Sequence, residues 1–189
     1  MESLRAAIAA ILSFLTFYGG VFALVASTAT VGIGLVASDR VIMRPELRLA
    51  AQAVHRALAV ATIVFLITHI ALETAAGRVR PVDSVVPFLA PGRTFYIGLG
   101  TLASDFIIVI AVTGFARARF THGRLKPRVW RAIHAVAYLA WPLAIIHGLL
   151  AGRQPKPYVT WSYGICVIAV VVALLTRLAA GAYTRRATR

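Results

Sequence analysis

Four of the five histidines in this chain lie inside two apolar segments, and their type and spacing suggest chemistry. His55 and His69 are fourteen residues apart in the first segment, and His134 and His147 are thirteen apart in the second. At the α-helical rise these intervals correspond to about 21 Å and about 20 Å. Because an ionisable residue inside a membrane helix is rarely kept without a partner, we treat the four histidines as a functional site.

Two haems explain this spacing better than the other ligands that histidine binds. A planar macrocycle held between two helices needs one imidazole from each helix at the same depth, and the sequence provides this twice. Zinc would need three or four ligands at about 2 Å, which histidines some 20 Å apart on a helix cannot supply. We therefore predict that all four histidines ligate haem iron. A proton or ion pathway and plain packing are the alternatives.

The thirteen-residue interval poses a problem of phase. Fourteen residues make about 3.9 turns, so His55 and His69 share a helix face, whereas thirteen make about 3.6 turns. His147 would then lie well off the face of His134. Pro142 lies between them and removes a backbone donor, so we expect a kink or local unwinding there to absorb the difference.

The elements that position these histidines are predicted to be membrane-spanning helices. The 189 residues are 60% hydrophobic with a mean hydropathy of +0.82, which is too apolar for a soluble domain. We predict an all-α integral membrane protein in which one domain, residues 1–189, forms a bundle of five transmembrane helices that binds two stacked haems. Splitting residues 4–38 would give a sixth span. The expected helices cover residues 14–38, 49–74, 95–115, 129–150 and 158–180.

The remaining segments carry weaker signals. Residues 77–94 contain three prolines and cannot form one helix, so we expect a loop whose apolar middle lies against the membrane surface. The first apolar stretch continues to Ser38, so it is interpreted as a retained span rather than a cleaved signal peptide. Cys166 lies in an apolar run and is expected to pack.

Charge predicts the orientation of the chain. Lys and Arg number 20 against 6 Asp and Glu, and fourteen of the basic residues fall on one side of the predicted spans. That side is predicted to be the cytoplasm, with the C-terminus there and the chain in the plasma membrane. His55 and His134 would then lie near the inner side, and His69 and His147 near the outer. Because the basic residues flank apolar spans, we expect lipid headgroups and not nucleic acid as partners.

Short motifs around the histidines resemble a known family. They are His55 followed by Arg56, the run P-F-L-A-P-G-R at residues 87–93, Arg131 three residues before His134, and I-H-G at residues 146–148. With the histidine spacing, they resemble the ferric reductase-like transmembrane domain of ferric reductases, NADPH oxidases and the haem-bearing membrane subunit of the periplasmic methionine sulfoxide reductase system. The likeness covers residues 15–178 and is closest to short bacterial members without a fused flavin domain.

The resemblance implies transmembrane electron transfer through two b-type haems. His55 with His134 would hold an inner haem b, and His69 with His147 an outer one. Iron with both axial positions filled by protein has no open site for substrate and suits one-electron transfer. We therefore expect the membrane electron-transfer component of an oxidoreductase. A proton-coupled membrane transporter and a haem-free assembly subunit are the alternative functions.

Two motifs that the sequence lacks suggest how haem would be held and which electron donors to expect. It has no C-x-x-C-H motif, so haem would be held noncovalently. It has no G-x-G-x-x-G or flavin-domain sequence either. We therefore expect a separate cytoplasmic flavoprotein, ferredoxin or quinol as the donor, with an acceptor on the outer face.

Other candidate residues surround the predicted ligands. Haem propionates need guanidinium or backbone donors, and Arg56 and Arg131 are favoured because each is close to a histidine in sequence. Asp105 is the only acid deep in an apolar span, where it is expected to be protonated, hydrogen-bonded or part of a proton path. Further propionate candidates are Arg48 on the inner side and Arg78, Arg80, Arg93 and Arg153 on the outer side.

A last group of residues is assigned to solvent, interfaces or packing. Glu73 is placed at the outer surface, with solvation and support of His69 as equal alternatives. His122 is expected to be solvated. The aromatic residues are assigned to interface belts or haem-pocket packing, with packing favoured only for Trp141; they are Trp130, Trp141, Trp161, Tyr158 and Tyr163.

Overall fold

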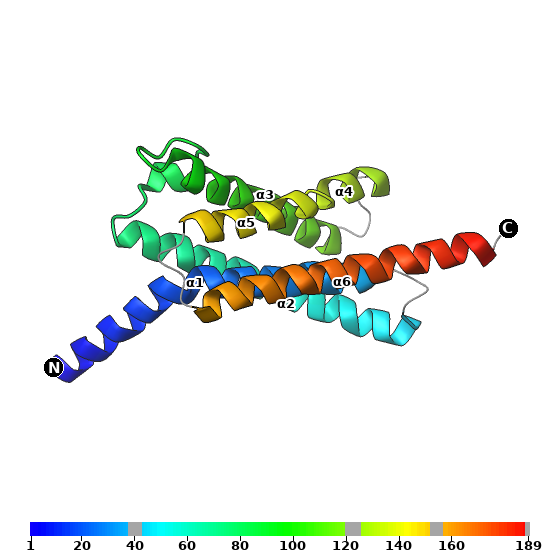
Figure 1. Ribbon diagram of the computed structural model, residues 1–189, viewed down its shortest axis with the longest axis horizontal. Coiled ribbons are helices and arrows are strands. Elements are labelled where there is room, and N and C mark those ends of the chain that lie inside the picture. Colours follow the sequence, from blue (N-terminus) through cyan, green and yellow to red (C-terminus); the bar gives the residue numbers. More distant parts are fainter. Residues whose placement is uncertain (38–42, 120–125, 152–156, 188–189) are drawn as a thin grey trace. The chain divides into compact units, whose positions relative to one another are not determined.

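The computed structural model describes residues 1–37, 43–119, 126–151 and 157–187, and its regular elements in these ranges are all helices (Figure 1). Five segments are long and apolar enough to cross a membrane, with α4 and α5 counted as one. The predicted all-α class with five such helices is therefore confirmed. The elements are α1 (Glu2–Ala37), α2 (Pro45–Ala75), the 3₁₀ helix η1 (Pro81–Ser84), α3 (Thr94–Arg119), α4 (Pro127–His134), α5 (Ala137–Ala151) and α6 (Pro157–Ala187).

Four of the five predicted spans are single helices with shifted ends, and the fifth is divided in two. α1 begins at Glu2 and runs without a break to Ala37, so residues 4–37 are not split into two spans. The segment predicted as one helix over residues 129–150 is instead two helices that meet at Ala135 and Val136. This interruption lies between two of the candidate ligands.

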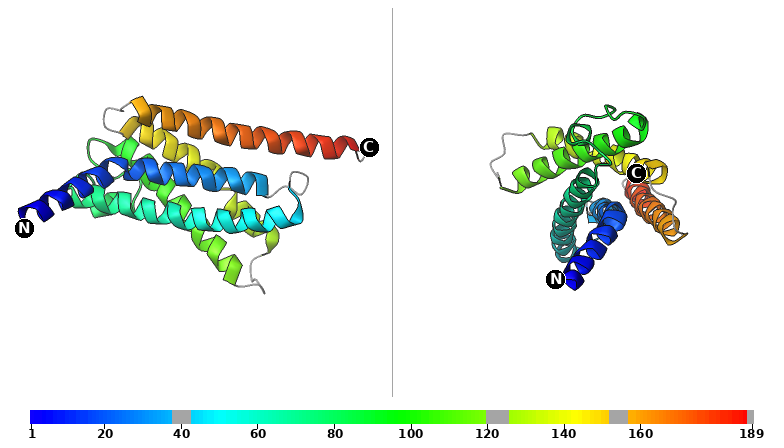
Figure 2. Two further views of the ribbon diagram at one scale, coloured as in Figure 1. Left: turned by 90° about the horizontal axis from the view of Figure 1, so that it is seen from below. Right: turned by 90° about the vertical axis from the view of Figure 1, so that its left-hand side faces the viewer.

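Contacts divide the chain into two compact units, and each is described by itself. The first unit comprises Met1–Ala23 and Ile63–Gln154, and the second comprises Leu24–Thr62 and Pro155–Arg189. In the first unit α3 packs along α5 and also contacts α4 and η1 (Figures 1 and 2). The organisation of residues 1–189 as one domain stays a prediction.

Small residues form the most buried positions of the first unit. Ala90, Ala103 and Ala140 are each 2% exposed, whereas Ile108, Val109 and Val112 of α3 are exposed. Alanine lets backbones approach closely, which is how helices associate where lipid removes the hydrophobic driving force. The unit therefore has a packed interior of small side chains and an apolar exterior suited to lipid.

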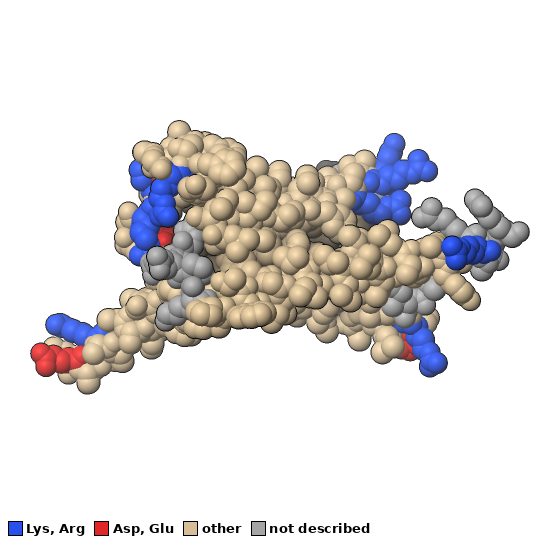
Figure 3. All heavy atoms as spheres, viewed as in Figure 1, with Lys and Arg blue, Asp and Glu red and all other residues tan. Residues whose placement is uncertain are grey.

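Polar groups along the helices are satisfied locally or lie at helix ends. The hydroxyl groups of Thr28, Thr62 and Ser104 each donate to the carbonyl four residues earlier, at 2.8 Å in every case. Lys and Arg side chains gather at the helix ends on the face shown in Figure 3. Both arrangements are those that a bilayer requires.

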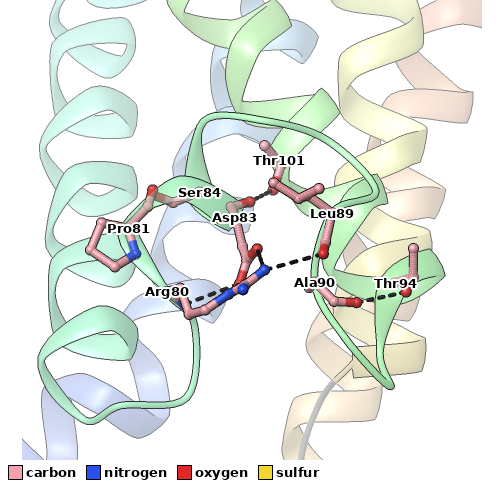
Figure 4. Close-up of polar contacts among 8 residues, drawn as sticks. All are labelled: Arg80, Pro81, Asp83, Ser84, Leu89, Ala90, Thr94 and Thr101. Carbon is pink, nitrogen blue, oxygen red and sulfur yellow. Dashed lines mark hydrogen bonds and ion pairs between the residues drawn. The ribbon is translucent and has the colours of Figure 1, made fainter.

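The segment between α2 and α3 is a structured loop, as predicted from its three prolines. Arg80 donates to the Asp83 carboxylate through Nε at 2.9 Å and Nη2 at 2.6 Å (Figure 4). Thr101 of α3 donates through Oγ1 to the Asp83 carbonyl at 2.7 Å, and Thr94 donates to the Ala90 carbonyl at 2.6 Å. These bonds attach the loop to the first turns of α3.

Candidate functional site

His69 and His147 come together in the first unit, from α2 and α5. Their ring centroids are 6.5 Å apart, and the ring planes are inclined by 66°. Two imidazoles on opposite sides of one metal, each bonded at about 2 Å, have centroids about 6.3 Å apart, because the ring centre lies about 1.2 Å behind the bonding nitrogen. The two rings thus stand at a separation that one shared iron would require.

The second ring nitrogen of His147 has a backbone partner. Its Nδ1–H donates to the Tyr96 carbonyl of α3 at 2.7 Å. Metal-ligating histidines usually donate their other N–H to a carbonyl or carboxylate, which fixes the tautomer and orients the ring. This bond leaves Nε2 of His147 as the nitrogen that can bind a metal.

His69 shows a different feature. Its Nδ1 is buried and has no hydrogen-bond partner within the described ranges. A buried polar atom without a partner costs free energy, so its presence needs a reason. A ligand bound at Nδ1 itself would supply one.

Glycines on the facing helices make room for both rings. A Cβ added at Gly100 of α3 would lie 2.6 Å from both Cε1 and Nδ1 of His147. A Cβ added at Gly20 of α1 would lie 3.2 Å from Cε1 of His69. A side chain at Gly100 would therefore displace the His147 ring, whereas one at Gly20 would press on the His69 ring by a few tenths of an ångström.

His55, in the second unit, repeats the arrangement of His147. Its Nδ1–H donates to the Thr30 carbonyl of α1 at 2.9 Å, and a Cβ at Gly34 would lie 3.0 Å from its Cε1. Thr30 precedes Gly34 by four residues, as Tyr96 precedes Gly100. Each ring thus lies against a glycine and donates to the carbonyl one turn before it.

His134, at the end of α4, is held mainly by aromatic stacking. The Trp130 indole stacks on its ring with centroids 4.8 Å apart and planes inclined by 18°. The Arg117 guanidinium of α3 lies 4.4 Å from the centre of the Trp130 ring. A Cβ at Gly114 would be 4.0 Å from Cε1 of His134, so this glycine contact is the loosest of the four.

Gly20 and Gly34 were expected only to form small-residue faces for close helix packing, and the contact of glycines with the histidine rings is the feature that the sequence analysis missed. Gly20 and Gly34 are fourteen residues apart on α1, and Gly100 and Gly114 are fourteen apart on α3. This interval matches the histidine spacing on α2, and each glycine faces one histidine. The equal intervals were visible in the sequence, although nothing in it says which faces the glycines occupy.

The expected kink at Pro142 was wrong in position. The helix is interrupted at Ala135 and Val136, and Pro142 lies inside α5. Three backbone hydrogen bonds here span three residues instead of four. They run from the N–H groups of Val136, Tyr138 and Leu139 to the carbonyls of Ile133, Ala135 and Val136, at 3.1, 3.0 and 2.9 Å. Pro142 offers no N–H to the Tyr138 carbonyl, so the irregular winding lies on its N-terminal side.

Two of the outer arginine candidates are engaged in ion pairs. Arg78 binds Glu73, whose carboxylate holds the pKa of the guanidinium above its usual value through their hydrogen bond. Arg80 binds Asp83 and also donates to the Leu89 carbonyl at 3.2 Å. The Arg80 side chain holds the pKa of Asp83 below its ordinary value, again by hydrogen bonding. Glu73 is therefore an ion-pair partner rather than a solvated acid.

The other arginine candidates differ in exposure. Arg56, Arg93 and Arg131 are exposed. Arg48 is half-buried, and its Nε has no hydrogen-bond partner among the residues described. Arg153 and His122 lie outside the described residues. Arg48 thus has the geometry of an anion-binding side chain more clearly than the two favoured candidates.

The remaining predictions divide between burial and exposure. Cys166 is 4% exposed and packs, as predicted. Trp161 and Tyr158 are exposed, which suits an interface, whereas Tyr163 is buried at 8%. Packing therefore applies to Tyr163 and to Trp130 as well as to the half-buried Trp141. Asp105 is half-buried in α3 and forms no hydrogen bond or ion pair within the described part of the chain.

Only one of the two predicted histidine pairs lies within a single unit. His69 and His147 belong to the same unit, whereas His55 and His134 belong to different units, so their pairing stays a prediction. The described residues include no group of three or more His, Cys, Asp and Glu side chains that could hold a bare metal ion. Comparison with protein-family models, curated proteins and solved structures finds no match to this chain.

Proposed function

We propose that this chain is a membrane electron-transfer subunit that holds two b-type haems by its four span histidines. The observation that carries the proposal is the separation of the His69 and His147 rings, 6.5 Å between centroids. Haem b bound there would supply a one-electron Fe(III)/Fe(II) couple, and His69 and His147 would be the residues that hold it. Such a site transfers electrons without binding substrate at the metal.

The residues around His147 and His55 support the same role. Donation from Nδ1 to the Tyr96 or Thr30 carbonyl orients the ring and raises the basicity of Nε2. The facing glycines let a ring lie against a helix backbone without steric conflict. Arg48, Arg56 and Arg131 are proposed to bind propionates at the inner site, with Arg48 the first choice because its Nε lacks a partner in the described ranges.

The proposed direction runs from a cytoplasmic donor to an acceptor on the outer face of the plasma membrane. The excess of Lys and Arg on the predicted inner side supports this orientation. The same basic residues would attract an acidic flavoprotein or ferredoxin. A quinol is the alternative donor.

The test is the haem content of the purified chain and of five single variants. We expect two haems per chain in the wild type, with a spectrum that changes on adding dithionite. His69→Ala or His147→Ala should remove one haem, and His55→Ala or His134→Ala the other. His122→Ala is the matched control, because it removes the one histidine that the proposal does not use. Full haem content in all four ligand variants would refute the assignment.

The alternative is a proton-coupled transporter, and the observation that favours it is the half-buried carboxyl group of Asp105, which has no partner among the residues that the structure describes. A buried acid within a span commonly marks an ion path. A transporter would show substrate flux in vesicles that needs Asp105 and persists without haem. A haem-free assembly subunit would instead purify colourless together with its partner.

A further inference from the structure

The loop between α2 and α3 exposes several apolar side chains and buries a carboxylate, which is the opposite of what a loop in water normally does. Loops in water expose polar side chains and bury little. Here the Asp83 side chain is 3% exposed and binds Arg80, while Val85 is 68% exposed. Val82, Val86, Phe88 and Leu89 are also exposed, at 44, 44, 44 and 47%.

The hydrogen bonds of this loop are made largely within the loop itself, although the Arg80 side chain is 54% exposed. Arg80 bridges the Asp83 carboxylate and the Leu89 carbonyl, and so closes the loop across nine residues (Figure 4). Ser84 donates to the Pro81 carbonyl at 2.7 Å. A buried, paired carboxylate, exposed apolar side chains and exposed guanidinium groups together suit the boundary between acyl chains and headgroups.

The position of the loop indicates which medium covers it. The loop joins α2 to α3, both of which are long and apolar enough to span a membrane, so it lies where these spans end. Phe95 and Tyr96 at the start of α3 are exposed and continue the apolar surface into the span. The stretch 76–93 also carries three arginines and one aspartate, so its net charge suits anionic lipid headgroups.

The loop is fixed to the helix that positions His147. Thr101 donates to the Asp83 carbonyl, and a Cβ at Gly98 would lie 2.7 Å from the Phe88 backbone nitrogen. Gly98 lies between Tyr96, whose carbonyl binds His147, and Gly100, which faces the His147 ring. The loop therefore holds the same two turns of α3 that contact the His147 ring.

We propose that residues 81–92 form a membrane strap: their apolar side chains insert among the lipids at the end of α2 and α3, and this insertion holds the first turns of α3 in place. Insertion of this kind reaches roughly 5–10 Å into the boundary between headgroups and acyl chains. The strap does not depend on haem binding, since it concerns only lipid and α3.

The experiment places a fluorescent probe on the strap in a Cys166→Ser background. Val85→Cys is labelled with an environment-sensitive dye, and the full chain is reconstituted in phosphatidylcholine vesicles with and without phosphatidylglycerol. We expect blue-shifted emission and strong quenching by lipids with a nitroxide near the headgroup, more so with phosphatidylglycerol. Arg186→Cys, beyond the apolar part of α6, is the matched control and should stay in water.

Two further variants keep the result decisive. Leu89→Cys repeats the measurement at a second exposed position, in case one labelled variant fails to fold. Val85→Asp should lose lipid contact and speed hydrogen exchange in the first turns of α3, whereas Thr101→Val should speed exchange there without loss of lipid contact. A probe that stays in water in every vesicle overturns the proposal. Burial of the probe only after a soluble protein is added also overturns it, because the surface would then serve a protein partner.

Discussion

The two segments that carry the histidines differ in their helical winding and in the number of residues between the histidines. His55 and His69 lie on α2, which is a single helix over thirty-one residues. His134 and His147 lie on α4 and α5, which are separated by two residues in a turn. The first segment has fourteen residues between its histidines and regular winding, and the second has thirteen residues and short hydrogen bonds near Val136.

The irregular winding offsets part of the rotation of the missing residue. An α-helical residue turns by about 100° and a 3₁₀ residue by about 120°, so fourteen α-helical residues turn by about 1400° and thirteen by about 1300°. If about five of the thirteen are wound as 3₁₀, the rotation returns to about 1400° and the rise is about 22 Å against 21 Å. Three i→i−3 bonds are present, and they supply about 60° of the about 100° that the missing residue would have added.

The largest effect is expected from changing the length of each histidine segment by one residue. Deletion of Ala61 leaves thirteen regular residues on α2 and turns His69 away from its glycine. We expect a loss of stability on the order of 3 kcal/mol and loss of one haem. Insertion of one alanine after Ala135 should be tolerated within about 1 kcal/mol, because relaxation of the short bonds offsets most of the added rotation.

Thermal unfolding and haem content are measured for both length variants. Insertion of one alanine after Ala61 is the control in α2, and it should be as harmful as the deletion there. Equal damage from the insertions in α2 and in α4–α5 would show that the interruption does not correct the phase.

Alanine substitutions at the facing glycines test how closely each helix backbone approaches its histidine ring. Gly100→Ala places a methyl group 2.6 Å from the His147 ring, so we expect a loss of about 1–3 kcal/mol from overpacking. Gly114→Ala meets the His134 ring only at 4.0 Å and should gain up to about 1 kcal/mol from helix propensity. Denaturant unfolding measures both, and opposite signs are the expected result. A gain at Gly100 would contradict this close contact.

Removing the indole of Trp130 tests what holds His134 in place of a tight glycine contact. Trp130→Leu removes the stack on His134 and the contact with Arg117, and each such interaction contributes about 1 kcal/mol. We expect a small loss of stability and a changed electron paramagnetic resonance signal of one haem only. Trp161→Leu, at an exposed position, is the control and should leave that signal unchanged.

Asp83 provides a reference outside both histidine segments and should have the smallest effect. Its pKa is held below the unfolded value, so the folded state gains stability above the unfolded pKa of about 4 and loses it as the pH falls through the folded pKa. Stability measured from pH 6 down to acid should fall less in Asp83→Asn than in wild type. An identical fall in both would show that the Arg80 pair does not contribute.

Some features of the fold and of the candidate site can be predicted from the sequence, because each depends on residues within one segment. The apolar lengths of the spans fix five helices, and the positions of His55 and His69 fix their separation on α2. The three prolines of residues 77–94 exclude one continuous helix over that stretch, and the structure has only the short 3₁₀ helix η1 there. In each case the information lies within a few turns of one segment.

Other features depend on which surfaces face one another. The roles of Gly20, Gly34, Gly100 and Gly114 appear only once α1 faces α2 and α3 faces α5 or α4. The ion pairs of Glu73 and Asp83 likewise depend on loop geometry that charge counting could not supply.

By itself the sequence determined the long apolar segments, the apolar surroundings of the four histidines and their spacing along each segment, because hydrophobic length and residue interval are local quantities. Tertiary structure decided that His69 meets His147, that each ring lies against a glycine, and that the helix breaks at Ala135 and Val136 rather than at Pro142. Those outcomes depend on steric fit between helices distant in sequence. A proline also disturbs the turn before it in a way that packing, not sequence position, resolves.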